Sequence, residues 1–221
     1  MGGKLLGWNT VCAVEINPFA RAILLARQKD GMLNRFPIWD DITTFNGHRW
    51  KGFVDIVTGG FPCQDISQAG KGQGIGGKRS GLWNQMARVI SEVQPQHVLV
   101  ENSPLLISRG LDVVLADFAQ MGFNAKWGII SAENTKAPHQ RKRIWIVAHS
   151  QMLDETWSHK KKNRRELEQR YKHRGSVWGK ARPKPRRMDD GLANGVDRLE
   201  AIGNGQVPEV VRFAWRLLTS V

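Results

Sequence analysis

Between Val11 and Ala148 the chain alternates short apolar runs with longer amphipathic stretches. The runs have the length of buried strands, and the stretches between them follow the spacing of helices. Strands separated by helices are typical of a parallel sheet covered on both faces. The sequence therefore predicts an α/β fold, with strands at 11–16, 54–58, 97–100, 125–130 and 144–148, and helices at 18–28, 82–93, 111–121 and 208–218.

Polar and reactive residues follow these strand-like runs. Glu15, Asp41, the pair Pro62-Cys63 and Glu101 all stand at or just after the end of a run. Parallel α/β sheets bind ligands at the carboxyl ends of their strands. We therefore expect these side chains to meet at one edge of the sheet and to form its binding site.

Composition is that of a soluble, single-domain protein. The chain has 221 residues, of which 41% are hydrophobic, enough for one core. No apolar run has the length of a membrane helix and no signal pattern opens the chain, so we expect a cytoplasmic protein without a membrane partner. Two cysteines exclude a disulfide framework and a cysteine zinc cluster, and no metal is expected. Cys12 lies in an apolar run and is expected in the core, whereas Cys63 lies in a loop.

Positive charge is concentrated in one segment. The net charge is +13, and residues 151–187 hold 13 Lys and Arg against 4 Asp and Glu, which is +9 of that total. Trp157, Tyr171 and Trp178 stand between these charges. The segment is either a solvated surface region or a strip that follows nucleic-acid phosphates. We expect a catalytic α/β domain at 1–150, this basic segment, and a C-terminal part at 188–221 that returns to the domain.

Cys63 is the candidate nucleophile. It follows a strand end that turns through Gly59, Gly60 and Pro62. A thiol on such a tight turn is exposed and close to backbone amides, which favours the reactive thiolate. Because a lone intracellular cysteine is more often an inert core residue, this assignment depends on the residues that accompany it.

Glu101, Arg141 and Arg143 are the candidate partners of this thiol. Glu101 ends the run 97–100, where loss of water raises the pKa of a carboxyl group and leaves it a proton to donate to a ring nitrogen. By itself Glu101 is better explained as a cap of the next segment, before Pro104. Arg141 and Arg143 alternate before a strand and so share one face, where Arg143 could bind a carbonyl oxygen; a basic loop edge would have the same pattern.

Four short motifs occur in a fixed order: Pro62-Cys63-Gln64, Glu101-Asn102, Arg141-Lys142-Arg143 and Gly203-Asn204. With these motifs the chain resembles the DNA (cytosine-5)-methyltransferases, particularly the compact phage-encoded members. The resemblance covers most of the chain, and the combination of motifs is highly specific. It implies the α/β, doubly wound sheet of the S-adenosylmethionine-dependent methyltransferases, with a small basic target-recognition insertion.

The resemblance also implies roles for individual residues. Cys63 would add to C6 of a cytosine flipped out of double-stranded DNA. Glu101 would contact the ring N3 and amino group, and Arg143, with Arg141 as its neighbour, would bind the ring carbonyl. S-adenosylmethionine would be held by a further set of residues: Gly3, Glu15, Ile16, Asp41, Ile42, Pro62 and Asn204.

The chain departs from this family at its start. The family opens with a strand and a glycine turn, of which only Met1-Gly2-Gly3 is present, so we expect a sheet that lacks one central strand. The first interpretation is a monomeric DNA cytosine-5 methyltransferase of a bacterial or phage-infected cell. The alternatives are a non-catalytic DNA-binding remnant of such an enzyme and an RNA cytosine-5 methyltransferase.

Overall fold

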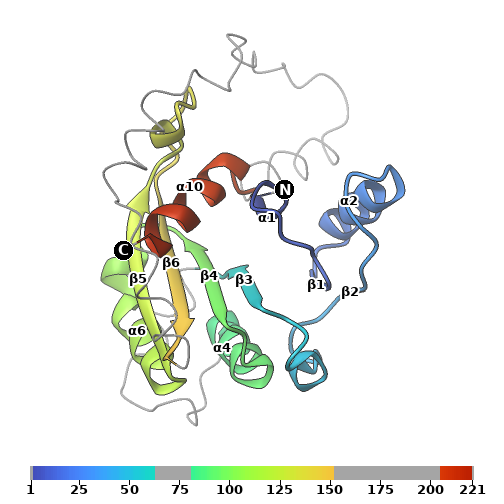
Figure 1. The fold of residues 1–221 in the computed structure, drawn as a ribbon, viewed down its shortest axis with the longest axis horizontal. Coiled ribbons are helices and arrows are strands. Elements are labelled where there is room, and N and C mark those ends of the chain that lie inside the picture. Colours follow the sequence, from blue (N-terminus) through green and yellow to red (C-terminus); the bar gives the residue numbers. More distant parts are fainter. Residues whose placement is uncertain (1, 63–80, 152–204, 221) are drawn as a thin grey trace.

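A four-stranded sheet forms the centre of the structure (Figure 1). The computed structural model describes residues 2–62, 81–151 and 205–220, and this sheet has the strand order β3-β4-β6-β5. Its elements agree with the sequence prediction to within two residues at each end. They are β3 (Ile56–Gly60), α4 (Leu82–Val93), β4 (His97–Asn102), α5 (Leu106–Arg109), α6 (Leu111–Gln120), β5 (Phe123–Ile130), η2 (Ala132–Thr135), β6 (Arg143–Ser150) and α10 (Pro208–Thr219); α5 and η2 are additional short turns.

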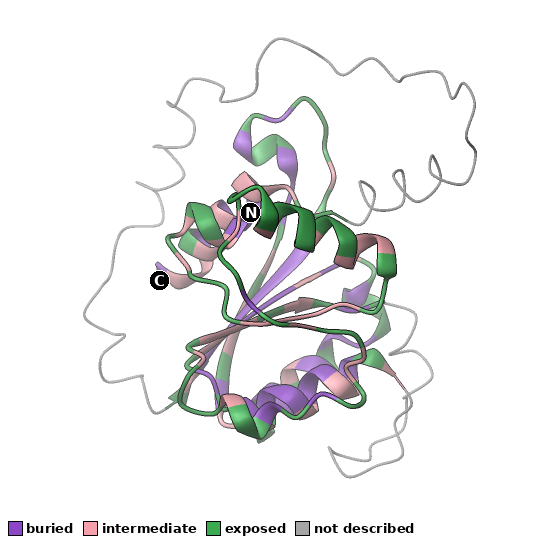
Figure 2. Ribbon diagram, turned by 90° about the vertical axis from the view of Figure 1, so that its right-hand side faces the viewer, coloured by how far each residue is buried: buried purple, intermediate pink, exposed green. Residues whose placement is uncertain are grey.

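Helices cover both faces of this sheet, which explains why β4 and β6 have continuous apolar runs. Successive residues of a strand point to opposite faces. On one face Val98 and Val100 of β4 pack with α4 and α6. On the other face Leu99 of β4 packs with α10. Figure 2 shows the buried strands between these helices. The prediction of an α/β fold covered on both faces is confirmed.

One strand contradicts the prediction of an all-parallel sheet. β3 and β4 are parallel, but β6 is antiparallel to both β4 and β5. The connection from β5 to β6 contains only the short turn η2 and no helix that could carry the chain across the sheet, so β6 returns beside β5 in the opposite direction. The first residue of β6, Arg143, therefore lies at the edge where β3 and β4 end.

The N-terminal part forms a second, smaller sheet. β1 (Ala13–Val14) and β2 (Ile38–Trp39) pair in parallel, and α2 (Pro18–Lys29) connects them. α2 begins as the sequence predicts, because the Asn17 side chain accepts hydrogen bonds from the first free N–H groups of the helix and Pro18 occupies its first turn. β1 is shorter than the predicted strand at 11–16.

The two sheets share one apolar cluster without joining. Val14 of β1 and Val57 of β3 both pack on the cluster formed by Phe45 and α4. Helix α4 also contacts η1 (Gly47–Trp50). Within the described residues β1 does not pair with β3, so two sheets stand where the sequence predicts one. Cys12 packs against this cluster, as predicted, and burial raises the pKa of its thiol.

The N-terminal turn α1 (Gly2–Leu5) packs against the C-terminal helix α10, as Figure 1 shows. A Cβ atom on Gly2 would lie 2.5 Å from the Cβ of Val211, so only glycine permits this approach. Trp8 and Trp215 make an edge-to-face contact with ring centroids 4.7 Å apart. In the three described ranges, no helix has the length and apolar character needed to cross a membrane.

Candidate active site

The carboxyl ends of β3 and β4 and the start of β6 meet at one edge of the main sheet. In the strand register, Glu101 of β4 lies between Gly60 of β3 and Trp145 of β6. Arg143 precedes Trp145 by two residues and so shares its face of β6. The reversed direction of β6 thus brings Arg143 beside Glu101.

Glu101 and Arg143 form an ion pair. Arg143 Nε lies 2.9 Å from Glu101 Oε1, and the two side chains are 29% and 13% exposed, respectively. Burial raises the pKa of Glu101 above that of an ordinary glutamate, in the direction that the sequence predicts. The charges of Arg143 and Arg141 and a hydrogen bond from Gln206 oppose this rise. Glu101 is therefore a carboxyl group that can hold a proton beside two positive charges.

Because Gly60 has no side chain, Glu101 can pack closely beside it. A Cβ atom at this position would lie 3.0 Å from the backbone oxygen of Glu101 and 3.4 Å from its Oε2. A residue with a side chain would have to displace the end of β4. The second glycine of the Gly59-Gly60 pair thus favours the close approach of β3 to the Glu101 carboxyl.

Asn102 hydrogen-bonds the segment that leads to Cys63. Its Nδ2 donates a hydrogen bond of 2.8 Å to the carbonyl oxygen of Phe61, and its Oδ1 accepts one of 2.7 Å from the N–H of Ser103. Phe61 and Asn102 are both buried. The chain therefore leaves β3 in a fixed position as far as Pro62. Cys63 itself lies outside the described residues, as do Asn204 and almost all of the basic segment 151–187.

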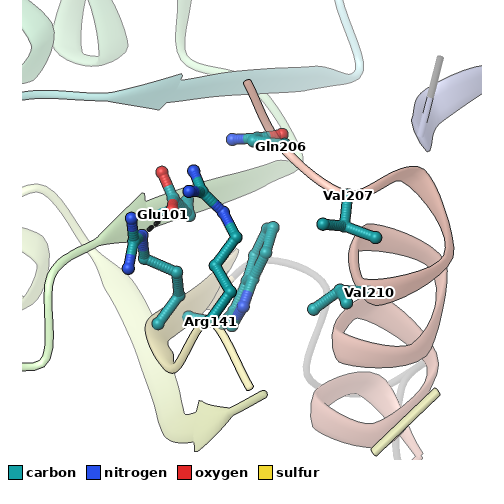
Figure 3. A pocket seen from close by; sticks show the side chains of 7 residues that line it. Glu101, Arg141, Gln206, Val207 and Val210 are labelled. Carbon is teal, nitrogen blue, oxygen red and sulfur yellow. Dashed lines mark ion pairs between the residues drawn. The ribbon is translucent and has the colours of Figure 1, made fainter. Parts of the chain in front are cut away.

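A small cavity opens next to Glu101 (Figure 3). Its volume is about 10 Å³, and it is lined by Glu101, Arg141, Arg143, Trp145, Gln206, Val207 and Val210. This volume is smaller than a nucleobase. His139, which alternates with the two arginines in sequence, is exposed and does not line the cavity.

The structure places the predicted cofactor residues of β1 and β2 at a common edge. Val14 and Trp39 are register partners, so Glu15 and Asp41 both follow the same end of the small sheet. Glu15 Oε1 accepts a hydrogen bond of 2.9 Å from the N–H of Asn17. Asp41 Oδ1 accepts one of 2.8 Å from the N–H of Thr43, and this bond lowers the pKa of Asp41.

These residues fit the polar and apolar parts of S-adenosylmethionine. Two carboxylates at one strand edge can accept hydrogen bonds from ribose hydroxyls and from an adenine amino group, and the side chain of Ile16 beside them is 72% exposed. Ile42 instead packs against the apolar cluster under β1. Gly3 lies in α1 against the ring of Trp8. No group of three or more His, Cys, Asp and Glu in the part of the chain that the structure describes could hold a metal ion.

Comparison with protein-family models identifies the family of this chain. The family model for C-5 cytosine-specific DNA methylases matches residues 1–199. The chain belongs to this family. The resemblance that the four motifs indicate is thus confirmed.

Curated members of the methylase family are similar over part of their length. The Type II methyltransferase M.CviJI of Paramecium bursaria Chlorella virus IL3A is 34% identical over 139 residues, which cover 62% of this chain and 36% of the relative. M2.BsuMI of Bacillus subtilis (strain 168) is 32% identical over 153 residues, which cover 64% of this chain and 36% of the relative. The chain therefore spans about a third of the length of the curated relatives that it matches.

Solved methyltransferase structures have the same fold. The Dnmt2 methyltransferase of S. pombe matches with a TM-score of 0.53 and 24% identity over 68% of this chain and 46% of that one. A putative DNA modification methyltransferase encoded within a prophage of E. coli matches with a TM-score of 0.53 and 23% identity, over 69% of this chain and 43% of that one. The predicted methyltransferase fold is confirmed.

Sequence reasoning missed two residues of this candidate site. Asn102 was visible only as the neighbour of Glu101, and nothing in the sequence pairs it with Phe61, which is 41 positions away. Gln206 follows the Gly203-Asn204 motif, which places it near a functional segment but not beside Glu101. Both roles depend on how distant segments meet at the sheet edge.

Proposed function

We propose that this chain is the catalytic part of a DNA cytosine-5 methyltransferase, which transfers a methyl group to C5 of cytosine in double-stranded DNA. The observation that carries this proposal is the meeting of Glu101, Arg141 and Arg143 at the edge where β3 leads to Cys63. In this proposal the Glu101 carboxyl group contacts N3 of cytosine, and the Arg143 guanidinium group contacts its carbonyl oxygen. Membership of the methylase family supports the same reaction.

The Cys63 thiolate begins the reaction by adding to C6 of the ring. The new S–C6 bond moves the electrons of the C5–C6 double bond toward C5 and N3, and C5 becomes nucleophilic. After C5 has gained the methyl group, N3 returns its proton to Glu101 and C5 loses its own proton to water. The C5–C6 double bond then forms again, and the S–C6 bond breaks to release the Cys63 thiolate. Covalent addition thus divides one difficult substitution into two easier steps.

Glu101 and Arg143 stabilise the charge that this addition creates. The raised pKa of Glu101 allows its carboxyl group to donate a proton to N3 as that atom becomes negative. Arg143 leaves Glu101 and donates to the ring carbonyl oxygen, so the ion pair of the free protein is exchanged for contacts with the base. Arg141 stays beside them and adds positive charge.

We assign the cofactor to the edge formed by β1 and β2. S-adenosylmethionine supplies the electrophilic methyl group when it is bound. Glu15 accepts from the ribose hydroxyls, Asp41 accepts from the adenine amino group, and the exposed Ile16 packs on the adenine ring. Gly3, Ile42, Pro62 and Asn204 complete this set in the proposal.

DNA binds through the basic segment 151–187, whose excess of +9 charges follows the phosphates. The target cytosine flips out of the duplex, since C6 of a stacked base is out of reach of a protein thiol. We expect the protein to act as a monomer in the cytoplasm of a bacterial or phage-infected cell.

A covalent trap tests this proposal. Fluorine at C5 cannot leave as the proton does, so a mixed-sequence duplex containing 5-fluorocytosine should accumulate a denaturation-resistant adduct when S-adenosylmethionine is present. The Cys63→Ala variant should form no adduct. Cys12→Ala is the matched control, because Cys12 belongs to the apolar cluster under β1, and it should trap the DNA like the parent protein.

Each other outcome identifies an alternative. An adduct with a 5-fluorocytidine RNA, and none with DNA, would assign the activity to RNA. DNA binding without any adduct would make the chain a non-catalytic binding protein. An adduct that persists in Cys63→Ala would end the assignment of the nucleophile.

A further inference from the structure

The lead-in to α10, residues 205–207, crosses over the edge where Glu101 lies. Arg141 Nη2 donates a hydrogen bond of 2.9 Å to the carbonyl oxygen of Gly205. Arg141 has a φ of +35°, which is uncommon for a residue with a side chain and costs backbone energy. Val207 then begins the apolar contact of α10 with the sheet. The lead-in is thus held at Gly205 and at Val207, the two neighbours of Gln206.

Gln206 reaches from this lead-in to the catalytic carboxyl. Its side chain lines the same cavity as Glu101 and Arg141, and Figure 3 shows it directed toward both. The side-chain amide of Gln206 faces the Glu101 carboxyl group across this cavity and favours its ionised form. Arg143 binds Oε1 of that same carboxyl group. Glu101 is therefore held by a charged partner from β6 and by a neutral partner from the C-terminal segment.

We propose that Gln206 is a positioning residue for Glu101, whose amide fixes the carboxyl group when Arg143 leaves it for the substrate. This inference rests on the proposed function, because it assumes that Glu101 works on a cytosine ring. When Arg143 transfers to the ring carbonyl, Glu101 loses its strongest partner. A neutral amide can remain in place during this exchange, since it does not compete for the base with a charge of its own.

The electrostatics of the pocket make this role measurable. Among the described residues, the charged groups that face Glu101 are Arg141 and Arg143, and β3 contributes only the glycine Gly60 on its side. The bond from Gln206 favours the ionised carboxyl, so its removal should raise the pKa of Glu101 further. A carboxylate in place of the amide should raise it more, because two negative charges would then face each other.

The experiment measures the Glu101 titration directly and the reaction separately. In full-length protein labelled with ¹³C at the glutamate carboxyl carbons, the Glu101 signal is assigned with Glu101→Gln and titrated in the parent, Gln206→Leu and Gln206→Glu proteins. The midpoint should rise in Gln206→Leu and rise further in Gln206→Glu. Gln151→Leu is the matched control, because Gln151 is exposed, follows the far end of β6 and should leave the midpoint unchanged.

Methyl transfer from S-adenosylmethionine to mixed-sequence duplex DNA supplies the second readout. In Gln206→Leu, kcat should fall roughly 10-fold with little change in KM for DNA, and the alkaline limb of the kcat profile should move to higher pH. Equal titration midpoints in the parent and Gln206→Leu would overturn the contact. If the midpoint differs between the parent and Gln206→Leu but kcat does not, the positioning role is overturned. If the midpoint differs but the parent protein itself transfers no methyl group, the result counts against the proposed function and leaves the contact standing.

Discussion

The hydrogen bonds of Asn102 offer a sharp test of how the site is built. Asn102→Ala removes the donor to the Phe61 carbonyl and the acceptor of the Ser103 N–H in a single change. Both bonds are short, and Asn102 is only 5% exposed. The variant should therefore lose stability and release the segment that leads to Cys63.

The magnitude follows from the two bonds. Each contributes about 0.5–1.5 kcal/mol net, and a buried group left without a partner costs about 1–3 kcal/mol. We expect the free energy of unfolding to fall by about 2–3 kcal/mol, which corresponds to a melting temperature roughly 5–10 °C lower for a chain of this size. A loss of this size is a large fraction of the stability of a typical domain, which is about 5–15 kcal/mol.

Urea unfolding of the parent and Asn102→Ala proteins measures this loss. Asn34→Ala is the matched control, because Asn34 donates a bond of 2.7 Å to Asn9 between two exposed side chains. It should change stability by no more than about 0.5 kcal/mol. A second measurement labels the Cys63 thiol under native conditions in a Cys12→Ala background, where it is the only thiol left.

The labelling rate should rise in Asn102→Ala because the backbone before Cys63 loses its anchor. Two results would refute this reasoning: a stability loss no larger than that of Asn34→Ala, or a loss of the expected size with an unchanged labelling rate. The second would mean that Asn102 supports the fold without controlling the exposure of Cys63.

Three further predictions follow from charge, titration and packing. Because residues 151–187 carry 13 Lys and Arg against 4 Asp and Glu, DNA affinity should fall steeply between about 50 and about 200 mM salt, and an affinity independent of salt in a filter or anisotropy assay would contradict their role. Burial lowers the pKa of His97 below 6.5, so on acidification the unfolded chain binds a proton at this histidine before the folded chain does. The free energy of unfolding should be full above about pH 6.5 and should decline as the pH falls toward the lowered pKa. In urea unfolding, the midpoint of His97→Gln should decline less over this range than that of the parent protein. Gly60→Ala should cost about 1–3 kcal/mol by pressing a Cβ atom against Glu101, whereas Gly128→Ala in β5, where a Cβ atom would meet only Leu218 at 3.7 Å, should be tolerated in the same thermal melt.

Sequence patterns predicted the elements of the main sheet because those patterns are local. The apolar run that begins at His97 predicts a buried strand regardless of what pairs with it, and Asn17 with Pro18 marks the start of α2 within four residues. The order of the motifs around Cys63, Glu101 and Arg143 likewise indicated the methylase family without any coordinates. These inferences depend only on residues near one another in the chain, or on the order of short motifs.

Tertiary structure decided which of these residues meet. The direction of β6 depends on its connection from β5, which contains no helix, and that reversal is what brings Arg143 to Glu101. The hydrogen bond of Asn102 to Phe61 and the meeting of Gln206 and Glu101 in one cavity bring together segments that are distant in sequence. Such contacts leave no periodic pattern in the amino-acid order. Sequence alone therefore determined the family, the elements and the candidate residues. The partners of the Glu101 carboxyl were set by the packing of β3, β4, β6 and the lead-in to α10 at one edge, because hydrogen bonds and ion pairs act over a few ångströms of space rather than along the chain.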